Sequence, residues 1–179
     1  FEIHFAYGRG GKNKTKNTFY FGNKIEMFLH ILIIRFFGVE GYGSHFATQK
    51  LIKYIKKEKF DIVNIHNLHG YYLNFFTLLK FLEKENIKVV FEMHDEWAIN
   101  PRLAYSMNCS HCRDVIGKCT SKYNYPKSYT SVFDKYMLKK KKRMFLNFKK
   151  ENFLIITPSE TLKNEVENTF LNKFDIKCI

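Results

Sequence analysis

The sequence has 179 residues, enough for one domain with a substantial core and too few for two ordinary domains. Apolar residues make up 45% of the chain, which excludes wholesale disorder, and 4 cysteines are too few for a secreted disulfide framework. The formal net charge of +13 indicates attraction to an anionic partner such as nucleic acid, acidic phospholipid or a phosphorylated substrate.

The first elements in chain order are two strands and two helices. A strand-like run at 1–7 ends at the glycine-rich turn 8–11, and 18–21 predicts a second short strand. Asn23 is expected to cap a helix that reaches Phe37 and stops at Gly38. Apolar residues cover nearly the whole circumference of this helix, so we expect it to be buried or to lie against another apolar surface. Ser44 is expected to cap the next helix, which reaches Glu58.

The rest of the chain alternates strands and helices around an irregular stretch that runs to about residue 129. Strands are predicted at 61–66, 88–94, 153–157 and from 175 onward, and helices at 71–85, 130–148 and 159–170. This alternation predicts an α/β fold, a Rossmann-like parallel sheet with helices on both faces and right-handed crossovers. The basic run 139–143 is predicted to be a solvated helix face or, alternatively, a patch for an anionic membrane.

Both ends of the sequence indicate a fragment of a longer protein. Phe1 stands inside an apolar strand-like run, and the sequence stops where another strand begins. No signal peptide is visible, and the most apolar stretch, 27–37, is shorter than the roughly 20 residues that a bilayer requires. We therefore expect a cytoplasmic protein.

Polar side chains follow three of the predicted strands at the edge where parallel sheets bind ligands. An isolated histidine there, such as His66, is more often a hydrogen-bonded loop residue than a catalyst, whereas Asp95 can orient or charge the imidazole of His94. Gly70 allows a ligand to approach the backbone, and Ser159 stands at a helix start that favours anions. The three segments are His66-Asn67-Leu68-His69-Gly70-Tyr71, His94-Asp95-Glu96-Trp97 and Thr157-Pro158-Ser159.

The irregular stretch carries a cysteine pattern with two interpretations. Cys109 and Cys112 have the spacing of half a zinc site, and Cys119 follows after six residues. These three thiolates, with His111 or His94 as the fourth ligand, would bind a structural zinc. The alternative is that reduced cysteines pack a loop.

Several blocks occur in an order that resembles the amino-terminal domain of family 4 glycosyltransferases, in particular bacterial enzymes of exopolysaccharide, capsule or lipopolysaccharide biosynthesis. The likeness covers nearly the whole chain, and its most specific parts are His66-Asn67-Leu68-His69-Gly70-Tyr71-Tyr72 and His94-Asp95-Glu96-Trp97. The other blocks are Gly41-Tyr42-Gly43-Ser44, Asp61–Ile65, Tyr125-Pro126-Lys127-Ser128 and Thr157-Pro158-Ser159.

The resemblance implies one half of a GT-B fold, with the active site between two Rossmann-like domains. Residues 1–174 would form the acceptor-side domain without its first strand, and 175–179 would begin the linker to a donor domain. By analogy, catalytic His94 would contact the transferred sugar or the acceptor hydroxyl, and Ser159 would lie near the domain junction. The remaining substrate-binding residues would be Asn67, His69, Gly70, Tyr71, Asp95 and Trp97.

The implied function is retaining transfer of a sugar from a nucleotide-sugar to a glycan or lipid-linked saccharide, with no cofactor or divalent metal required. The protein would be cytoplasmic and peripheral at the inner face of the plasma membrane, and the fragment alone would be inactive. Relatives often carry Thr-Gly-His-Cys-Ala-Tyr where this chain has Asn100-Pro101-Arg102-Leu103-Ala104-Tyr105, a departure that weakens any transfer of roles there. The alternative is a non-catalytic basic module that binds nucleic acid or an anionic membrane.

Overall fold

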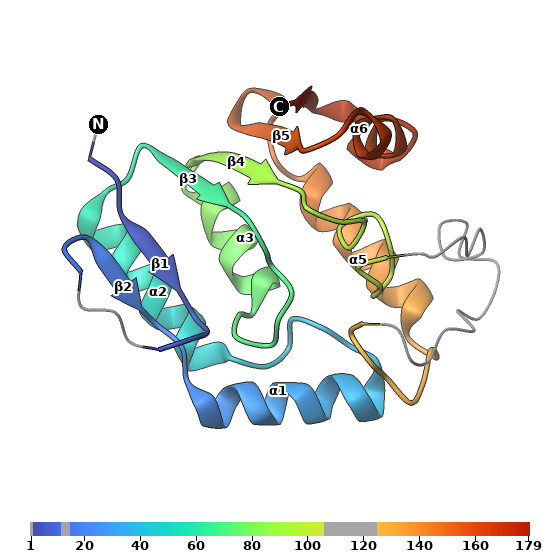
Figure 1. The fold of residues 1–179 in the computed structure, drawn as a ribbon, viewed down its shortest axis with the longest axis horizontal. Helices are drawn as coiled ribbons and strands as arrows, with labels where there is room; N and C mark the ends of the chain where they lie inside the picture. The colour runs from blue at the N-terminus through green and yellow to red at the C-terminus, as the bar shows by residue number, and fades with distance from the viewer. Residues whose placement is uncertain (1, 12–14, 106–124) are drawn as a thin grey trace.

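A computed structural model of the protein describes residues 2–11, 15–105 and 125–179 (Figure 1). The strands are β1 Phe5–Tyr7, β2 Thr18–Tyr20, β3 Ile62–Ile65, β4 Lys88–Glu92, β5 Phe153–Thr157 and β6 Asp175–Cys178. The helices are α1 Lys24–Phe37, α2 His45–Glu58, α3 Phe75–Lys84, α5 Asp134–Leu146 and α6 Glu160–Glu167, with short 3₁₀ turns at Lys150–Asn152 and Phe170–Lys173.

Four parallel strands form the main sheet, in the order β3-β4-β5-β6. Ile65 of β3 pairs with Phe91 of β4, and Glu92 of β4 pairs with Ile156 of β5. Each strand is reached from its neighbour through helical segments, as expected for parallel strands that need long crossovers. The α/β fold with a parallel sheet and interleaved helices is therefore confirmed, while β1 and β2 form a separate two-stranded parallel sheet.

The core lies on one face of the main sheet, toward α3 and α5. Val89 and Phe91 of β4 and Ile155 of β5 are buried, and the residues between them are half-buried. α5 contributes Phe145, whose ring stacks on that of Phe91 with centroids 5.7 Å apart. Each fully buried side chain of this size contributes about 1.5–3 kcal/mol through the hydrophobic effect, so this face fixes the strand ends that carry the polar residues.

The predicted caps are confirmed for α1 but not for α2. Asn23 accepts hydrogen bonds from the N–H groups of Ile25 and Glu26, and Gly38 ends α1 at a φ of 68°. Ser44 precedes α2, but its backbone is left-handed and its hydroxyl donates to a carbonyl elsewhere. The Glu26 carboxylate caps α2 instead, because both of its oxygens accept backbone N–H groups of the first turn of α2 at 2.8 Å.

Of the two alternatives expected for α1, burial or contact with another apolar surface, burial is wrong for most of its surface. Figure 1 shows α1 across the lower end of the molecule, away from the main sheet, and its buried residues are His30 and Ile34. Five large apolar side chains of α1 are exposed by more than half: Ile25, Phe28, Leu29, Phe36 and Phe37. None of the helices in the described part of the chain is long and apolar enough to cross a bilayer.

The prediction that the basic run 139–143 is a solvated helix face is wrong at Lys141, which is completely buried. Met137, Lys141 and Phe145 recur every four residues along α5, so all three face the core. Lys140 lies over the rings of Tyr42 and Phe76, 4.1 Å from each centroid. The charge of Lys141 is thus available to the interior rather than to a membrane.

Candidate active-site crevice

A crevice opens at the carboxyl ends of β3 and β4. The pairing of Ile65 with Phe91 places the next residues of the two strands, His66 and Glu92, side by side. The crevice therefore gathers histidines and acids from two segments that are about 25 residues apart in sequence. Its lining residues are His66, Asn67, Leu68, His69, Phe91, Glu92, Met93, His94, Asp95, Trp97 and Ala98.

The inner part of the crevice is a buried histidine–aspartate pair, His69 and Asp95. Nε2–H of His69 donates to Oδ2 of Asp95 at 2.7 Å, and the two side chains are only 8% and 12% exposed. Oδ1 of Asp95 accepts the backbone N–H of Trp97 at 2.9 Å. The sequence predicted that Asp95 orients His94, whereas in the structure Asp95 orients His69. Nδ1 of His69 has no hydrogen-bond partner among the described residues.

The outer part of the crevice is an exposed cluster of His66, Glu92 and His94. Nδ1 of His66 lies 3.2 Å from Nε2 of His94 and 3.3 Å from Oε2 of Glu92. Nε2 of His94 lies 3.8 Å from Oε1 of Glu92, and the two imidazole planes differ by 15°. His66 and His94 are about half exposed, so both can meet a bound molecule and exchange protons with it.

The backbone between the two strand ends is held in an unusual conformation at residues 70 and 71. Gly70 has a φ of 132°, and a Cβ there would lie 2.8 Å from the ring of Tyr72, so a side chain would be strained. Tyr71 also has a positive φ, 71°, and its carbonyl accepts hydrogen bonds from His30 at 2.8 Å and Ser44 at 2.5 Å. Both residues shape the loop that carries His69, and neither lines the crevice.

A buried ion pair supports the loop that follows β4. Trp97 donates from Nε1 to Glu40 at 2.5 Å, and Lys141 donates to the carbonyls of Trp97 and Asn100 at 2.9 and 3.2 Å. Nζ of Lys141 lies 3.5 Å from Glu40 and 3.6 Å from the centroid of the Trp97 indole. Burial lowers the pKa of Lys141 to about 8 and raises the pKa of Glu40, and the attraction between the two charges opposes both changes.

Two further predicted substrate-binding residues, Trp97 and Ser159, have structural roles in this arrangement. Trp97 lines the crevice but is only 1% exposed, and its indole packs edge-on against Phe75 with the ring centroids 4.8 Å apart, so it stabilises the loop. Ser159 is exposed beyond β5, outside the crevice lining, and its hydroxyl caps α6 by accepting the N–H of Leu162 at 3.2 Å. The crevice is thus built from two of the three predicted strand ends.

The sequence interpretation missed Glu92 and gave His66 no site role. Both residues directly follow the paired residues Ile65 and Phe91, and this strand register comes from the structure. No comparable signal exists for Glu40 and Lys141, which belong to distant segments. The predicted zinc ligands Cys109, Cys112 and Cys119 lie outside the described residues, and no finding supports that zinc.

Comparisons with known proteins give the family. The family model described as "Glycosyltransferase Family 4" matches residues 22–179. WcaC of Escherichia coli (strain K12), provisionally named as a colanic acid biosynthesis glycosyl transferase, is 26% identical over 133 residues. That match covers 68% of this chain and 32% of WcaC, so the chain spans about a third of this relative's length. No solved structure matches significantly. Because the family model covers nearly all of the chain, including the whole crevice, the chain belongs to Glycosyltransferase Family 4, a family of enzymes.

Proposed function

We propose that the enzyme containing this chain is a retaining glycosyltransferase of bacterial surface-polysaccharide synthesis, and that this chain forms its acceptor side. The donor would be a nucleotide-sugar, and the acceptor a glycan or a lipid-linked saccharide. The observation that carries the proposal is the crevice at the carboxyl ends of β3 and β4, where open parallel sheets bind ligands. Family membership supports the nucleotide-sugar donor, and the name of WcaC supports the polysaccharide context.

Within this proposal the two parts of the crevice have different tasks. His94 contacts the transferred sugar or the acceptor hydroxyl, because its imidazole is exposed and offers both a donor and an acceptor nitrogen. Asp95 acts through His69, which it holds by a 2.7 Å hydrogen bond. Asn67 is exposed beside them, and its Oδ1 accepts the backbone N–H of His69 at 3.2 Å. The acceptor side therefore combines the exposed imidazole of His94 with Asn67, His69 and Asp95, which are held in place by hydrogen bonds.

Product analysis tests the reaction class. The full-length enzyme, offered a panel of nucleotide-sugars with lipid-linked saccharides from bacterial membranes, is expected to form one product with the anomeric configuration of the donor. Residues 1–179 alone are expected neither to transfer nor to hydrolyse the same donors, since the donor-binding contacts would lie in the other domain. Inversion of configuration, or turnover by residues 1–179 alone, would contradict the proposal.

We further propose that the protein lies at the inner face of the plasma membrane and binds anionic lipid through α1. The α1 surface consists of the five exposed apolar residues of α1 together with Tyr129, Val132 and Phe133, which are 65%, 78% and 42% exposed. Tyr129 joins the two segments, because its N–H donates to the carbonyl of Arg35 at 2.8 Å and its ring lies 5.7 Å from that of Phe36. Such a continuous apolar surface indicates an interaction site.

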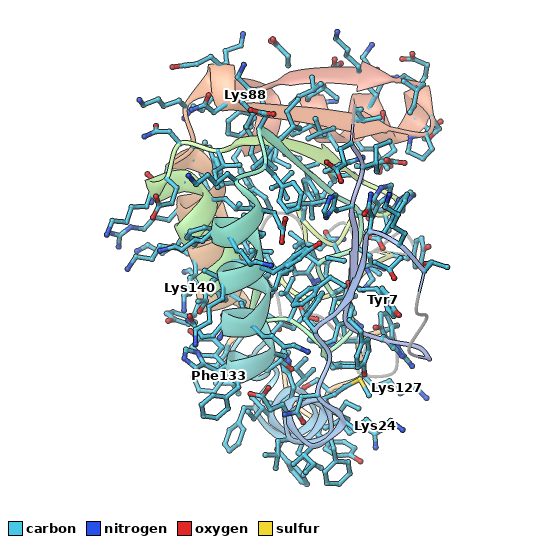
Figure 2. The ribbon with its side chains drawn as sticks, turned by 90° about the vertical axis from the view of Figure 1, so that its left-hand side faces the viewer. Tyr7, Lys24, Lys88, Lys127, Phe133 and Lys140 are labelled. Atoms are coloured by element: carbon cyan, nitrogen blue, oxygen red, sulfur yellow. The ribbon has the colours of Figure 1, made fainter. Side chains whose placement is uncertain are left out.

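The charges around the α1 surface favour an anionic bilayer as its partner. Lys24, Arg35 and Lys127 are exposed there, and Figure 2 shows Lys24, Lys127 and Phe133 at the same end of the molecule. The acid of α1, Glu26, is engaged by backbone N–H groups of α2. Apolar helices flanked by basic residues lie in the bilayer interface, and each basic residue near an anionic surface contributes about 1 kcal/mol. This surface, rather than the run 139–143, is the better candidate for membrane contact.

Vesicle binding tests the membrane proposal with a matched pair of charge reversals. Lys24→Glu is expected to weaken binding to vesicles of phosphatidylglycerol and phosphatidylcholine by about 10-fold or more, since the reversal replaces attraction by repulsion. Lys88→Glu is the control, because Lys88 is exposed at the opposite end of the molecule (Figure 2). Equal binding by the two variants, or equal binding to vesicles without phosphatidylglycerol, would contradict this orientation.

A further inference from the structure

We propose that His66, Glu92 and His94 form a binding site for a divalent transition-metal ion, with Zn²⁺ as the best-fitting ion, on the rim of the crevice. These are the three residues in the described part of the chain whose ligand atoms converge in this way, all within 4.8 Å of one another. Two imidazoles and one carboxylate are a ligand set that zinc accepts readily, and three protein ligands leave a fourth position open. The site differs from the cysteine pattern at 109–119 in both residues and chemistry.

The distances between the ligand atoms fit a tetrahedral ion. Nitrogen and oxygen ligands about 2.0–2.1 Å from a tetrahedral zinc lie about 3.3–3.4 Å from one another. Nδ1 of His66 lies 3.2 Å from Nε2 of His94 and 3.3 Å from Oε2 of Glu92. Nε2 of His94 lies 3.8 Å from the other oxygen of Glu92, Oε1, and one ligand atom from each of the three residues lies within 4.8 Å of the other two.

The two imidazoles lie close together on the rim. Their planes differ by 15° with the ring centroids 5.5 Å apart, and Nδ1 of His66 and Nε2 of His94 face each other at 3.2 Å. Without an ion, Nδ1 of His66 has two neighbours within 3.3 Å and at most one proton to share between them. An ion that accepts both nitrogens and the carboxylate oxygen uses all three groups at once.

The surroundings supply support for the ligands and access for the ion. Nε2 of His66 lies 3.4 Å from the side-chain amide of Asn64, a contact that leaves Nδ1 for the ion. Glu92 ends β4 and His66 directly follows the paired strand β3, so their backbones are fixed before the ion arrives. The side chains of His66 and His94 are 55% and 47% exposed, which opens the site to ions from solution.

Metal binding would have a consequence for catalysis, and this consequence rests on the proposed function. An ion held by Nε2 of His94 withdraws that nitrogen from the sugar, so Zn²⁺ would inhibit transfer and a chelator would restore it. Binding itself is measured without a nucleotide-sugar. If the chain does not bind Zn²⁺, the transferase proposal is unaffected. If it binds Zn²⁺ without loss of transfer, the metal site stands and the role of His94 in transfer is in question.

The test is titration of residues 1–179 with Co²⁺ followed by absorption spectroscopy, together with Zn²⁺ titration by calorimetry. We expect 1:1 binding and a cobalt spectrum without the intense thiolate charge-transfer band that cysteine ligands would add. His66→Ala with His94→Ala is expected to weaken binding by about 100-fold or more, and Asn64→Ala by about 10-fold. His45→Ala, which removes an exposed histidine outside the crevice, is the matched control and should bind as the unsubstituted chain does.

A second measurement does not depend on the variants folding. Of the 7 histidines, two are expected to show shifted imidazole C–H resonances by NMR when Zn²⁺ is added to the unsubstituted chain. A thiolate band in the cobalt spectrum, unchanged affinity in the double variant, or zinc-insensitive histidine resonances would each overturn the proposal.

Discussion

The inner and outer parts of the crevice use the same residue types on the same two strand ends, and they differ in burial. His69 and Asp95 are about one-tenth exposed and make one short hydrogen bond, whereas His66 and His94 are half exposed and make longer contacts of 3.2–3.8 Å. A buried polar group depends on its partner, because losing it costs the full desolvation penalty, and an exposed group can turn to water instead. The inner pair is therefore structural support, and the outer cluster is free to exchange one partner for another.

The largest loss of stability is expected when the buried cation, Lys141, is removed. Lys141→Met leaves the Glu40 carboxylate buried without its counter-charge and two carbonyls without their donor, so we expect a loss of about 3–5 kcal/mol in the free energy of unfolding. Urea denaturation of residues 1–179 measures it. Lys142→Met, on the exposed side of the same helix, is the control and should change stability by about 0.5 kcal/mol or less. Equal losses in the two variants would mean that the buried pair does not support the loop.

Lowering the pH should lower the free energy of unfolding through His30. This residue of α1 is hydrogen-bonded to the loop that carries the inner pair. Its Nδ1–H donates to the carbonyl of Tyr71, and its Nε2 accepts the N–H of Gly41 at 3.2 Å. Both nitrogens are thus used by the neutral ring, and burial lowers the pKa of His30 to about 4. Because this pKa lies below the unfolded value of 6.5, the contribution is present above pH 6.5 and is lost as the pH falls through 4.

Denaturation at several pH values measures the contribution of His30. The difference of the two pKa values corresponds to roughly 3 kcal/mol of stability lost by pH 4. His30→Gln should be less stable at neutral pH and should lack this part of the pH dependence, whereas His45→Gln should retain it. A pH profile that is unchanged in His30→Gln would show that another group titrates.

Substitution in the inner pair should cost more stability than substitution in the outer cluster. Asp95→Ala leaves Nε2 of His69 and the N–H of Trp97 without their acceptor, which we expect to cost about 1–3 kcal/mol of stability. His66→Ala should cost about 0.5 kcal/mol or less, because its contacts are exposed. If the two substitutions cost the same in thermal denaturation, burial does not distinguish the two parts.

Local sequence patterns predicted the elements well and the contacts between them poorly. Asn23, Gly38 and Ser159 stand at helix ends because capping depends on a few neighbouring residues, and the strand β5 was predicted at its observed bounds. The cap of α2 comes from Glu26, which stands 20 residues before the N–H group that it accepts. A capping pattern compares only a few neighbouring residues, so it cannot predict this contact.

The candidate site shows the same limit. Asn67, His69, His94 and Asp95 were predicted from their position after apolar strands, and all four line the crevice. Adjacency in sequence favoured His94 as the partner of Asp95, but the contact is with His69. The choice between the two imidazoles depends on how two loops fold over the sheet edge. Lys141 was assigned to solvent because charge runs usually are solvated, and its burial depends on a tryptophan and a glutamate far away in sequence.

The most direct test of the central claim is turnover of the full-length enzyme with His94→Ala, beside His45→Ala as the control. If the outer cluster of this crevice contacts the reacting sugar, His94→Ala should lower kcat by about 100-fold or more, the range of a positioned acid–base group, with no change in thermal denaturation. His45→Ala should turn over as the unsubstituted enzyme does. Near-normal kcat in His94→Ala, with the donor and acceptor saturating, would contradict the assignment of this crevice to the reaction.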